Sequence, residues 1–309
     1  MVPTEPRDPV GANWADGRIL SPGEAAVRAD DHSVVVGDGV FETTGVLDGV
    51  PFALTRHLAR LARSAAGLGI QTPDNAQIRE AIAEVVAADR RAGLLRITWS
   101  SGPGPLGSGR GDEPGTLVLS TGPGNVWPAT ERVHLGPWAR NEHGALTGLK
   151  TTSYAENAKA LAVAHRHGCT EALFRNTAGH LCEGTGTNIF LVVDDVLVTP
   201  PLSSGCLAGV TRGLLLELVD VVERDVALDE IEVASEAFLS SATRDVSSIA
   251  AVDDHDLPTA PGPVTTAVAA AFAALVARTP DPEPATHRPS GNGGVATYPV
   301  RRGEGGRRR

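Results

Sequence analysis

The chain has 309 residues, of which 41% are hydrophobic, and this is enough to build one large domain or two domains of ordinary size. Its formal net charge of −10 and its isoelectric point near 5.4 argue against nucleic-acid and membrane-surface partners, because both require a basic face. The first twenty residues lack the apolar core of a signal peptide, and the three cysteines lack the spacing of a disulfide framework. We therefore expect a cytoplasmic protein.

Residues 1–121 are predicted to form a small N-terminal domain in which short strands alternate with helices. A hairpin is expected around Leu47-Asp48-Gly49, because Asp-Gly between two apolar runs favours a tight turn. An amphipathic helix over 55–68 is expected to end at Gly69, which can adopt the left-handed cap conformation. The other expected elements are strands 40–46, 51–54, 94–100 and 116–121 and a helix over about 74–92.

One Gly-rich pattern in this domain is interpreted as a loop. Residues 102–107 read GPGPLG and satisfy the GxGxxG spacing of dinucleotide-binding turns. The segment contains two prolines and leads into a strand, so no helix N-terminus is available for a pyrophosphate. We expect it only to join two strands.

After a linker over 122–130, a larger C-terminal domain is predicted over 131–278. Its expected elements are helices 154–167 and 211–222, strands near 171–175, 187–193, 237–241 and 246–252, and a helix from Val264. The apolar run 264–277 is too short to span a bilayer and is interpreted as a core helix.

Two further segments are predicted to have no chemical role. His165 and His167 precede Gly168 at the end of a helix, where favourable contact with the terminal carbonyls explains them better than a metal site. No metal is expected. From Thr279 onward the chain is rich in Pro, Gly and Arg, and residues 279–309 are expected to form a disordered, solvating tail.

The lysine content is unusual. The chain has 25 arginines but only two lysines, Lys150 and Lys159, so nearly all surface cations are Arg. Arg cannot lose its proton, whereas a buried Lys amine can be shifted to a pKa of roughly 7 to 8 and act as a nucleophile. Both lysines could also be ordinary solvated charges, and their context has to decide.

That context consists of three sequence features that could bind an anion or a cofactor. Glu183, followed by Gly-Thr-Gly-Thr, places a carboxylate where a flat ligand can approach closely. Lys150 and Glu183 together have the composition of a pyridoxal phosphate site, which needs an amine for the Schiff base and an acid for the pyridinium nitrogen. Residues 207–212 (LAGVTR) open a helix whose amides, with Thr211 as a hydroxyl cap, can bind a phosphate, and Arg60 can complete that site.

These segments together resemble the class IV aminotransferases, the fold-type IV pyridoxal phosphate enzymes that include branched-chain and D-amino acid aminotransferases and aminodeoxychorismate lyase. The resemblance covers about residues 13–275. It is carried, in order, by GDGVFET at 37–43, HLARL at 57–61, GLKTTSY at 148–154, EGTGTNIF at 183–190, LAGVTR at 207–212 and FLSSATRDV at 238–246.

The resemblance implies a fold, a cofactor and a set of site residues. The fold is α/β (α+β), with a small N-terminal α/β domain, a larger C-terminal domain, the cofactor pyridoxal 5'-phosphate between them, and a homodimer whose partner loop reaches the site. Lys150 is implied as the catalytic Schiff-base lysine and Glu183 as the partner of the pyridine nitrogen. The implied phosphate-binding residues are Arg60, Val210, Thr211, Ser241 and Ala242, although some relatives have Thr at the position of Ala242.

The reaction branch is less well defined. The primary expectation is transfer of the amino group of an amino acid to a keto acid, and the alternative is an aminodeoxychorismate lyase that releases pyruvate and p-aminobenzoate for folate synthesis. Arg96 and Arg110 are the cations best placed to bind a substrate carboxylate. An arginine in the Gly-rich loop, such as Arg110, favours the lyase reaction. Arg110 can equally be a solvated loop residue. EGTGTNIF resembles the branched-chain pattern most, and GDGVFET resembles the lyase and D-amino acid branches. Val34 stands where the D-amino acid branch has a tyrosine.

Two other classes remain open from the sequence. The chain could be a relative that binds the cofactor without turnover, or an enzyme that uses no pyridoxal phosphate and matches these motifs by accident. Visible absorption by the cofactor-loaded protein would separate both from the primary expectation.

Overall fold

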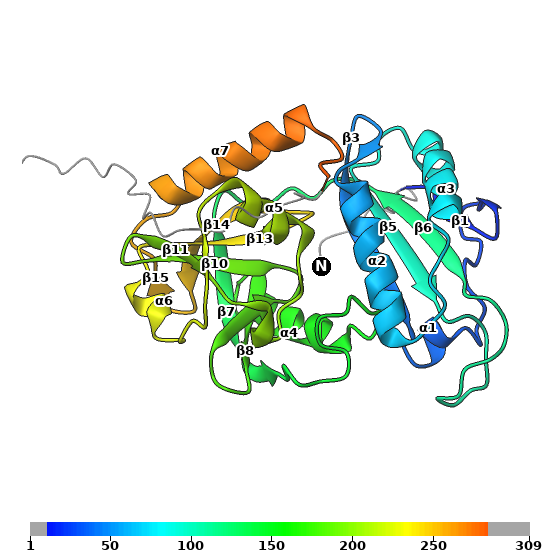
Figure 1. Ribbon diagram of the computed structural model, residues 1–309, viewed down its shortest axis with the longest axis horizontal. Helices are drawn as coiled ribbons and strands as arrows, with labels where there is room; N and C mark the ends of the chain where they lie inside the picture. Colours follow the sequence, from blue (N-terminus) through cyan, green and yellow to red (C-terminus); the bar gives the residue numbers. More distant parts are fainter. Residues whose placement is uncertain (1–10, 284–309) are drawn as a thin grey trace, which may run out of the picture.

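The computed structural model describes residues 11–283, and residues 1–10 and 284–309 lie outside the described part. Figure 1 shows two lobes, each built on its own sheet, with α2 at the side of the first lobe that faces the second. The first lobe comprises β1 (Asn13–Ala15), β2 (Arg18–Ile19), α1 (His32–Val35), β3 (Gly39–Leu47), β4 (Val50–Pro51), α2 (Leu54–Leu68), α3 (Asn75–Ala88), β5 (Leu94–Ser100) and β6 (Leu117–Gly122).

The first sheet is antiparallel, with the strand order β2-β1-β6-β5-β3-β4. Helices α2 and α3 pack on it through one apolar stripe each, and the stripe of α2 contains Leu58, Leu61 and Ala65. These residues recur every three or four positions, which is the spacing of one helix face. Helix α2 ends at Gly69, whose φ of +73° is the left-handed cap conformation expected there.

The second lobe contains a nine-stranded mixed sheet with the order β12-β11-β10-β13-β14-β7-β8-β9, and β15 pairs with β14. Its elements are β7 (Glu131–Arg140), α4 (Ala155–Arg166), β8 (Glu171–Asn176), β9 (Leu181–Gly184), β10 (Asn188–Val193), β11 (Val196–Thr199), a 3-10 turn (Leu202–Ser204), α5 (Val210–Leu218), β12 (Val222–Glu223), α6 (Glu230–Val233), β13 (Glu236–Ser241), β14 (Asp245–Val252), β15 (His255–Asp256) and α7 (Pro263–Arg278).

Strand β10 explains how this lobe is layered, because all six of its residues are buried. Side chains alternate across a strand. Ile189 and Leu191 therefore join the core on one face, and Phe190 and Val192 join the core that α5 and α7 cover on the other face. The apolar run 264–277 forms most of α7, and within residues 11–283 no helix has the length and apolar character needed to cross a membrane.

Some expected boundaries are wrong, and strand β7 was not expected. Helix α3 ends at Ala88 rather than near residue 92, and α5 ends at Leu218 because Val219 is already extended toward β12. Strand β7 is central in the second sheet, yet Gly136-Pro137 interrupts its apolar pattern. Its pairing with β8 shifts register between Leu135 and Ala139, which accommodates the interruption.

The disordered tail was predicted to begin at residue 279, but residues 279–283 are ordered in the structure. The backbone carbonyl of Pro280 accepts a hydrogen bond from the Ala53 amide at 2.7 Å, and Asp281 accepts bonds from the Thr55 amide and hydroxyl at 2.9 and 2.6 Å. Residues 279–283 are thus fixed against the N-terminus of α2 by contacts that composition cannot reveal. The rest of the expected tail, residues 284–309, lies outside the described residues.

Candidate active site

A pocket of about 270 Å³ lies where the two lobes meet, and both lobes contribute to its wall. It is lined by eight of the nine site residues that the sequence predicts, namely Arg60, Arg96, Lys150, Glu183, Val210, Thr211, Ser241 and Ala242. Arg110 is the exception. Predicted site residues that lie up to 182 positions apart in the chain (Arg60 and Ala242) thus meet at one site.

The main chain around Lys150 is fixed by the first lobe. The Lys150 carbonyl accepts a hydrogen bond from the Phe41 amide of β3 at 3.0 Å, and the Thr152 amide donates to the Gly39 carbonyl at 2.8 Å. The Lys150 amide donates to the Ser64 hydroxyl of α2 at 3.1 Å. This segment follows β7 of the second lobe in sequence but pairs with β3, so Lys150 projects from a backbone that the first lobe holds in place.

The Lys150 amine lies against aromatic rings. Its Nζ is 4.4 Å from the centroid of Phe41 and 5.7 Å from that of Tyr154. Burial, and then the positive charge of Arg60, lower the pKa of Lys150 to about 8. At pH 7 an amine with this pKa is neutral in about a tenth of the molecules, far more than an ordinary lysine, and the neutral form can act as a nucleophile or a general base.

Arg60 is oriented by a buried carboxylate. Its Nε and one terminal nitrogen each donate to Glu42 at 2.7 Å, and its other terminal nitrogen donates to the Ala208 carbonyl at 3.1 Å. His57 contacts the same carboxylate through Nδ1 at 2.7 Å. A guanidinium has five N–H donors. Two of the five in Arg60 therefore remain for an anion in the pocket.

The N-terminus of α5 lines the same pocket, and the expected hydroxyl cap by Thr211 is wrong, because Thr211 lies inside the helix and no described side chain caps the helix. Gly209 is its N-cap residue, and a Cβ there would come within 2.0 Å of Asn188 Oδ1, so only glycine fits. Val210 and Thr211 begin the helix and line the pocket. Uncapped amides at the positive end of a helix dipole form an anion-binding site.

The last residues of β13 add hydroxyl groups to the same pocket. Ser240 lines the pocket, and its buried hydroxyl has no hydrogen-bond partner among the described residues. The Ser241 hydroxyl is engaged within its own turn, where it accepts from the Arg244 amide at 3.1 Å and from the Thr243 amide at 3.4 Å. Ala242 offers only its main chain.

Glu183 also lines the pocket, from a strand, β9, in which all four residues are buried. One carboxylate oxygen accepts from the Leu207 amide at 2.9 Å, and the other lies 3.7 Å from a terminal nitrogen of Arg140. Burial raises the pKa of Glu183, and Arg140 acts in the opposite direction by stabilising the ionised form.

Among the pocket residues that were not predicted from the sequence are Tyr154, Asn157 and Arg140. The Tyr154 hydroxyl donates to the Thr185 carbonyl at 2.7 Å, and burial raises the pKa of Tyr154 to about 12. Asn157 donates to the same carbonyl. Arg140 stands over the Phe174 ring at 4.4 Å, and its Nε and one terminal nitrogen are buried without a hydrogen bond among the described residues. Tyr154 was within reach of inference because it ends the GLKTTSY motif, but no sequence pattern marks Arg140.

The two predicted substrate-binding arginines differ in their surroundings. Arg96 stacks on Phe41 at 3.8 Å and, within residues 11–283, makes no hydrogen bond or ion pair, so its charge is available. Arg110 is exposed, forms a two-point ion pair with Asp38 at 2.6 and 2.8 Å, and donates to the carbonyls of Leu68 and Gly69. It lines a separate depression that shares Leu146 with the pocket.

The charges of the pocket wall favour an anionic ligand. Four cations line it (Arg60, Arg96, Arg140 and Lys150) but only one carboxylate, Glu183. Glu42, behind the wall, compensates one of these cations. The wall can therefore accept a ligand with several negative charges, such as a phosphate group together with a carboxylate.

Comparison with known proteins agrees with this geometry. A family model described as amino-transferase class IV matches residues 39–252. The chain is 28% identical to the D-alanine aminotransferase of Bacillus licheniformis over 271 residues, which cover 81% of this chain and 92% of that protein. It is 31% identical to the bifunctional aminodeoxychorismate lyase / D-amino acid transaminase of Mycobacterium tuberculosis over 231 residues, 66% of this chain and 76% of that protein.

A solved structure extends the agreement to the fold. The branched-chain aminotransferase of Thermoproteus uzoniensis superposes with a TM-score of 0.79 at 28% identity, over 86% of this chain and 95% of that one. The family and the fold class predicted from the motifs are therefore confirmed. The chain belongs to the class IV aminotransferase family and is an enzyme.

Proposed function

We propose that the protein binds pyridoxal 5'-phosphate in this pocket and transfers the amino group of an amino acid to a keto acid. The observation that carries the proposal is the arrangement of three groups in one pocket: the Lys150 amine, the Glu183 carboxylate, and an uncapped helix N-terminus beside Arg60. An amine, a ring-nitrogen partner and a phosphate receptor are what this cofactor requires.

The residues present fit the cofactor. The amides of Val210 and Thr211, the two free donors of Arg60 and the partnerless Ser240 hydroxyl would hold the phosphate, and the turn at Ser241 and Ala242 would close over it. Glu183 would hold a proton on the ring nitrogen. When bound, the cofactor supplies an electron sink for the substrate Cα.

The proton transfers fall to Lys150. With a pKa of about 8, its Nζ can take the proton from the substrate Cα and later return one. The Phe41 and Tyr154 rings beside Nζ exclude water on one side of the amine. The Thr185 carbonyl fixes the Tyr154 hydroxyl, so this part of the wall stays in one arrangement.

An α-amino acid also presents a carboxylate, and Arg96 is the group that suits it. It has no ion pair of its own among the described residues and lines the pocket. A charge-assisted hydrogen bond to a carboxylate contributes about 1.5 to 3 kcal/mol. Arg96 therefore supports an amino acid or an amino-group donor with a neighbouring carboxylate as substrate.

A second candidate function is the lyase reaction that releases pyruvate and p-aminobenzoate from aminodeoxychorismate. It is favoured by Arg110, whose depression shares Leu146 with the pocket and could take a second carboxylate. The ion pair of Arg110 with Asp38 counts against it, because a substrate would have to compete with that carboxylate. We therefore place transamination first.

One experiment distinguishes the two reactions. The purified, cofactor-loaded protein is incubated with a panel of L- and D-amino acids and keto-acid acceptors, and separately with aminodeoxychorismate. We expect keto-acid formation from at least one amino donor. Rapid formation of p-aminobenzoate without amino transfer to any keto acid would replace the first function by the second.

We also propose that the enzyme is a homodimer and works in the cytoplasm. The resemblance to the family supports the dimer, and three free, buried cysteines are consistent with a reducing compartment. Sedimentation of the holoenzyme tests the dimer: a single species with the mass of one chain would contradict it.

A further inference from the structure

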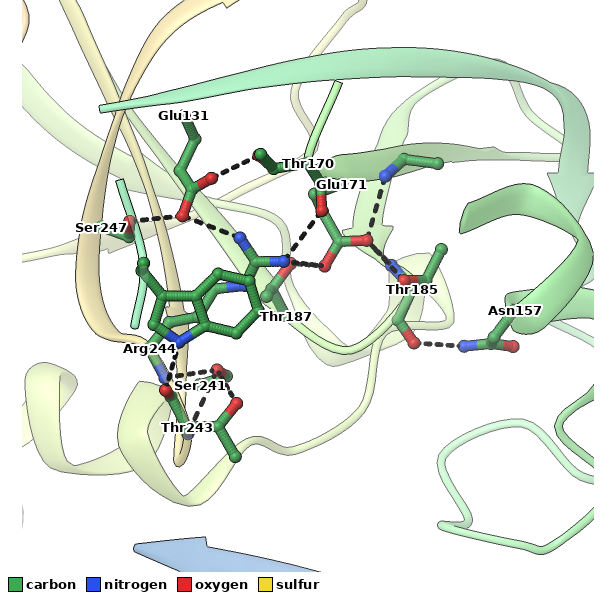
Figure 2. Close-up of polar contacts among 12 residues, drawn as sticks. Glu131, Asn157, Thr170, Glu171, Thr185, Thr187, Ser241, Thr243, Arg244 and Ser247 are labelled. Carbon is green, nitrogen blue, oxygen red and sulfur yellow. Dashed lines mark hydrogen bonds and ion pairs between the residues drawn. The ribbon is translucent and has the colours of Figure 1, made fainter. Parts of the chain in front are cut away.

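Behind the pocket lies a buried charged cluster that the proposed chemistry does not use. It consists of Glu131, Glu171 and Arg244, whose side chains are 0%, 2% and 5% exposed. We call it the Arg244 cluster. Figure 2 shows its guanidinium between the two carboxylates, with hydroxyl groups around them. Burying three charges is costly unless each is paired and hydrogen-bonded.

Arg244 is the centre of this cluster. One terminal nitrogen donates to Glu131 at 2.8 Å, and the other donates to the Thr170 carbonyl at 3.0 Å and lies 3.8 Å from Glu171. The indole of Trp127, from the segment between the two sheets, covers the guanidinium at 3.6 Å. Water is thereby kept from one face of the charge.

The cluster is tied to the anion-binding end of the pocket through Arg244. This residue directly follows the turn at 241–243, and its own amide donates to the Ser241 hydroxyl at 3.1 Å. Trp127 donates from its indole nitrogen to the Thr243 carbonyl at 2.6 Å. The side chain of Arg244 therefore anchors the turn from behind while the front of the turn lines the pocket.

The cluster is also tied, through Glu171, to the turn that follows Glu183 and lines the pocket. One of its oxygens accepts from the Thr185 amide at 3.1 Å and from the Thr185 hydroxyl, and the other accepts from the Thr187 hydroxyl at 3.2 Å. Figure 2 shows these contacts and the further bond from Asn157 to the Thr185 carbonyl. Glu171 thus fixes the turn that follows Glu183. The same turn holds Tyr154, because the Tyr154 hydroxyl donates to the Thr185 carbonyl.

We propose that Glu171 and Arg244 are positioning residues that fix the phosphate end and the ring end of the site relative to each other. The inference rests on the proposed function, because it assumes that one ligand contacts both turns. A buried, hydrogen-bonded charge cluster has essentially one arrangement, so the two turns cannot shift independently. Preorganisation of this kind matters because small displacements of binding groups reduce affinity and rate.

The test compares Glu171→Gln, Arg244→Met, Arg244→Lys and the double variant Glu171→Gln/Arg244→Met with the wild type. The matched control is Glu230→Gln, which removes a carboxylate that pairs with Arg224 in the same lobe and lines no part of the pocket. Three quantities are measured: the dissociation constants of pyridoxal 5'-phosphate and of pyridoxal, which lacks the phosphate, and the pH titration of the visible band of the bound cofactor.

We expect Arg244→Met to weaken pyridoxal 5'-phosphate binding about tenfold while pyridoxal binding changes little, because it loosens the phosphate end. Glu171→Gln should weaken both ligands and shift the pH titration, because it loosens the turn that holds Tyr154. The effect of the double variant should depart from the product of the single effects about threefold or more, as coupled residues do. Arg244→Lys keeps the buried positive charge. If Arg244→Met does not fold, Arg244→Lys is used instead to compare the binding of pyridoxal 5'-phosphate with that of pyridoxal.

Two results would overturn the inference. If the cluster variants have the same dissociation constants and pH titration as Glu230→Gln, the cluster has a structural role only. If the effect of the double variant equals the product of the two single effects, the two turns are not coupled through the cluster. A wild type that gives no visible band with pyridoxal 5'-phosphate is a different failure, because it removes the proposed function and this inference with it.

Discussion

Lys150 is one of two lysines in the chain, and this offers an unusually clean control. The amine of Lys150 lies in the pocket, whereas Lys159 is exposed on α4 with its Nζ 4.8 Å from the Trp138 ring. We predict that Lys150→Ala folds but forms no covalent bond with pyridoxal 5'-phosphate, and that Lys159→Ala behaves as wild type. Borohydride reduction makes the bond to the cofactor permanent, and peptide mass spectrometry then identifies the modified residue. Modification of Lys159 in the wild type would refute the assignment.

The lowered pKa of Lys150 leads to a second prediction at this scale. Only the neutral amine attacks an aldehyde, so the rate at which the apoprotein captures pyridoxal 5'-phosphate should rise with pH, with a midpoint near the amine pKa of about 8. Arg60 contributes to the low pKa, and Glu42 opposes it. Arg60→Gln should therefore move the midpoint to higher pH. Stopped-flow absorbance over a pH series measures the midpoints of the wild type and of the variant. An unchanged or lower midpoint in the variant would contradict this electrostatic account.

At the scale of elements, the main finding is that the last described residues complete a helix of the first lobe. Helix α2 starts after Ala53, which has a φ of +52° and provides no side-chain cap. Asp281 supplies the missing cap from 226 positions away. Arg56, in the first turn of α2, adds an ion pair with Glu217 of α5 at 2.8 Å. The two helices that carry Arg60 and the anion-binding amides are therefore linked directly.

We predict that Asp281→Ala lowers the free energy of unfolding by about 1 kcal/mol, as the loss of a helix cap usually does, and also weakens cofactor binding. Asp74→Ala is the matched control, because Asp74 caps α3 through the Ala76 amide at 2.8 Å and α3 contributes no residue to the pocket. Denaturant unfolding and cofactor titration are compared for both. Equal cofactor affinity in the two variants would show that the 279–283 segment serves stability alone.

At the scale of the whole molecule, the buried contacts of Glu42 and His57 make the fold sensitive to acid. Burial lowers the pKa of His57 below its ordinary value of 6.5, although Glu42 acts in the opposite direction. Burial alone would raise the pKa of Glu42, but Arg60 and His57 hold it far below 4.5. Both groups bind fewer protons in the folded state than in the unfolded state once the pH falls below these ordinary values, so acid favours unfolding.

We therefore predict that the free energy of unfolding declines as the pH falls below about 6.5 and declines further below about 4.5. His57→Gln removes the titration of that imidazole, so it should flatten the decline between these two values and leave the part below 4.5. Urea unfolding at a series of pH values measures the slopes. A slope between pH 6.5 and 4.5 that is the same in His57→Gln and wild type would exclude this role of His57.

The sequence by itself determined most of the local elements and the family, and it predicted two residues at the centre of the candidate site, Lys150 and Glu183. Side-chain periodicity located α2, β5 and β10, because burial of one face or both imposes a spacing on apolar residues. Lys150 and Glu183 were predicted as site residues because one is a rare lysine among arginines and the other a carboxylate followed by small and hydroxyl residues, and both line the same pocket. The start of a helix after residues 207–209 was likewise predicted from the local sequence.

Only the tertiary structure decided which distant groups complete and support the site. Arg140 has no motif, yet it meets Glu183 because β7 lies beside β8, which pairs with β9. The carboxylate of Glu171 reaches the turn at Thr185, and Asp281 reaches α2, only through the fold. The same residues in another topology would be ordinary surface charges. Local patterns follow from the needs of the backbone and of burial, whereas these pairings depend on how strands and helices are ordered in space.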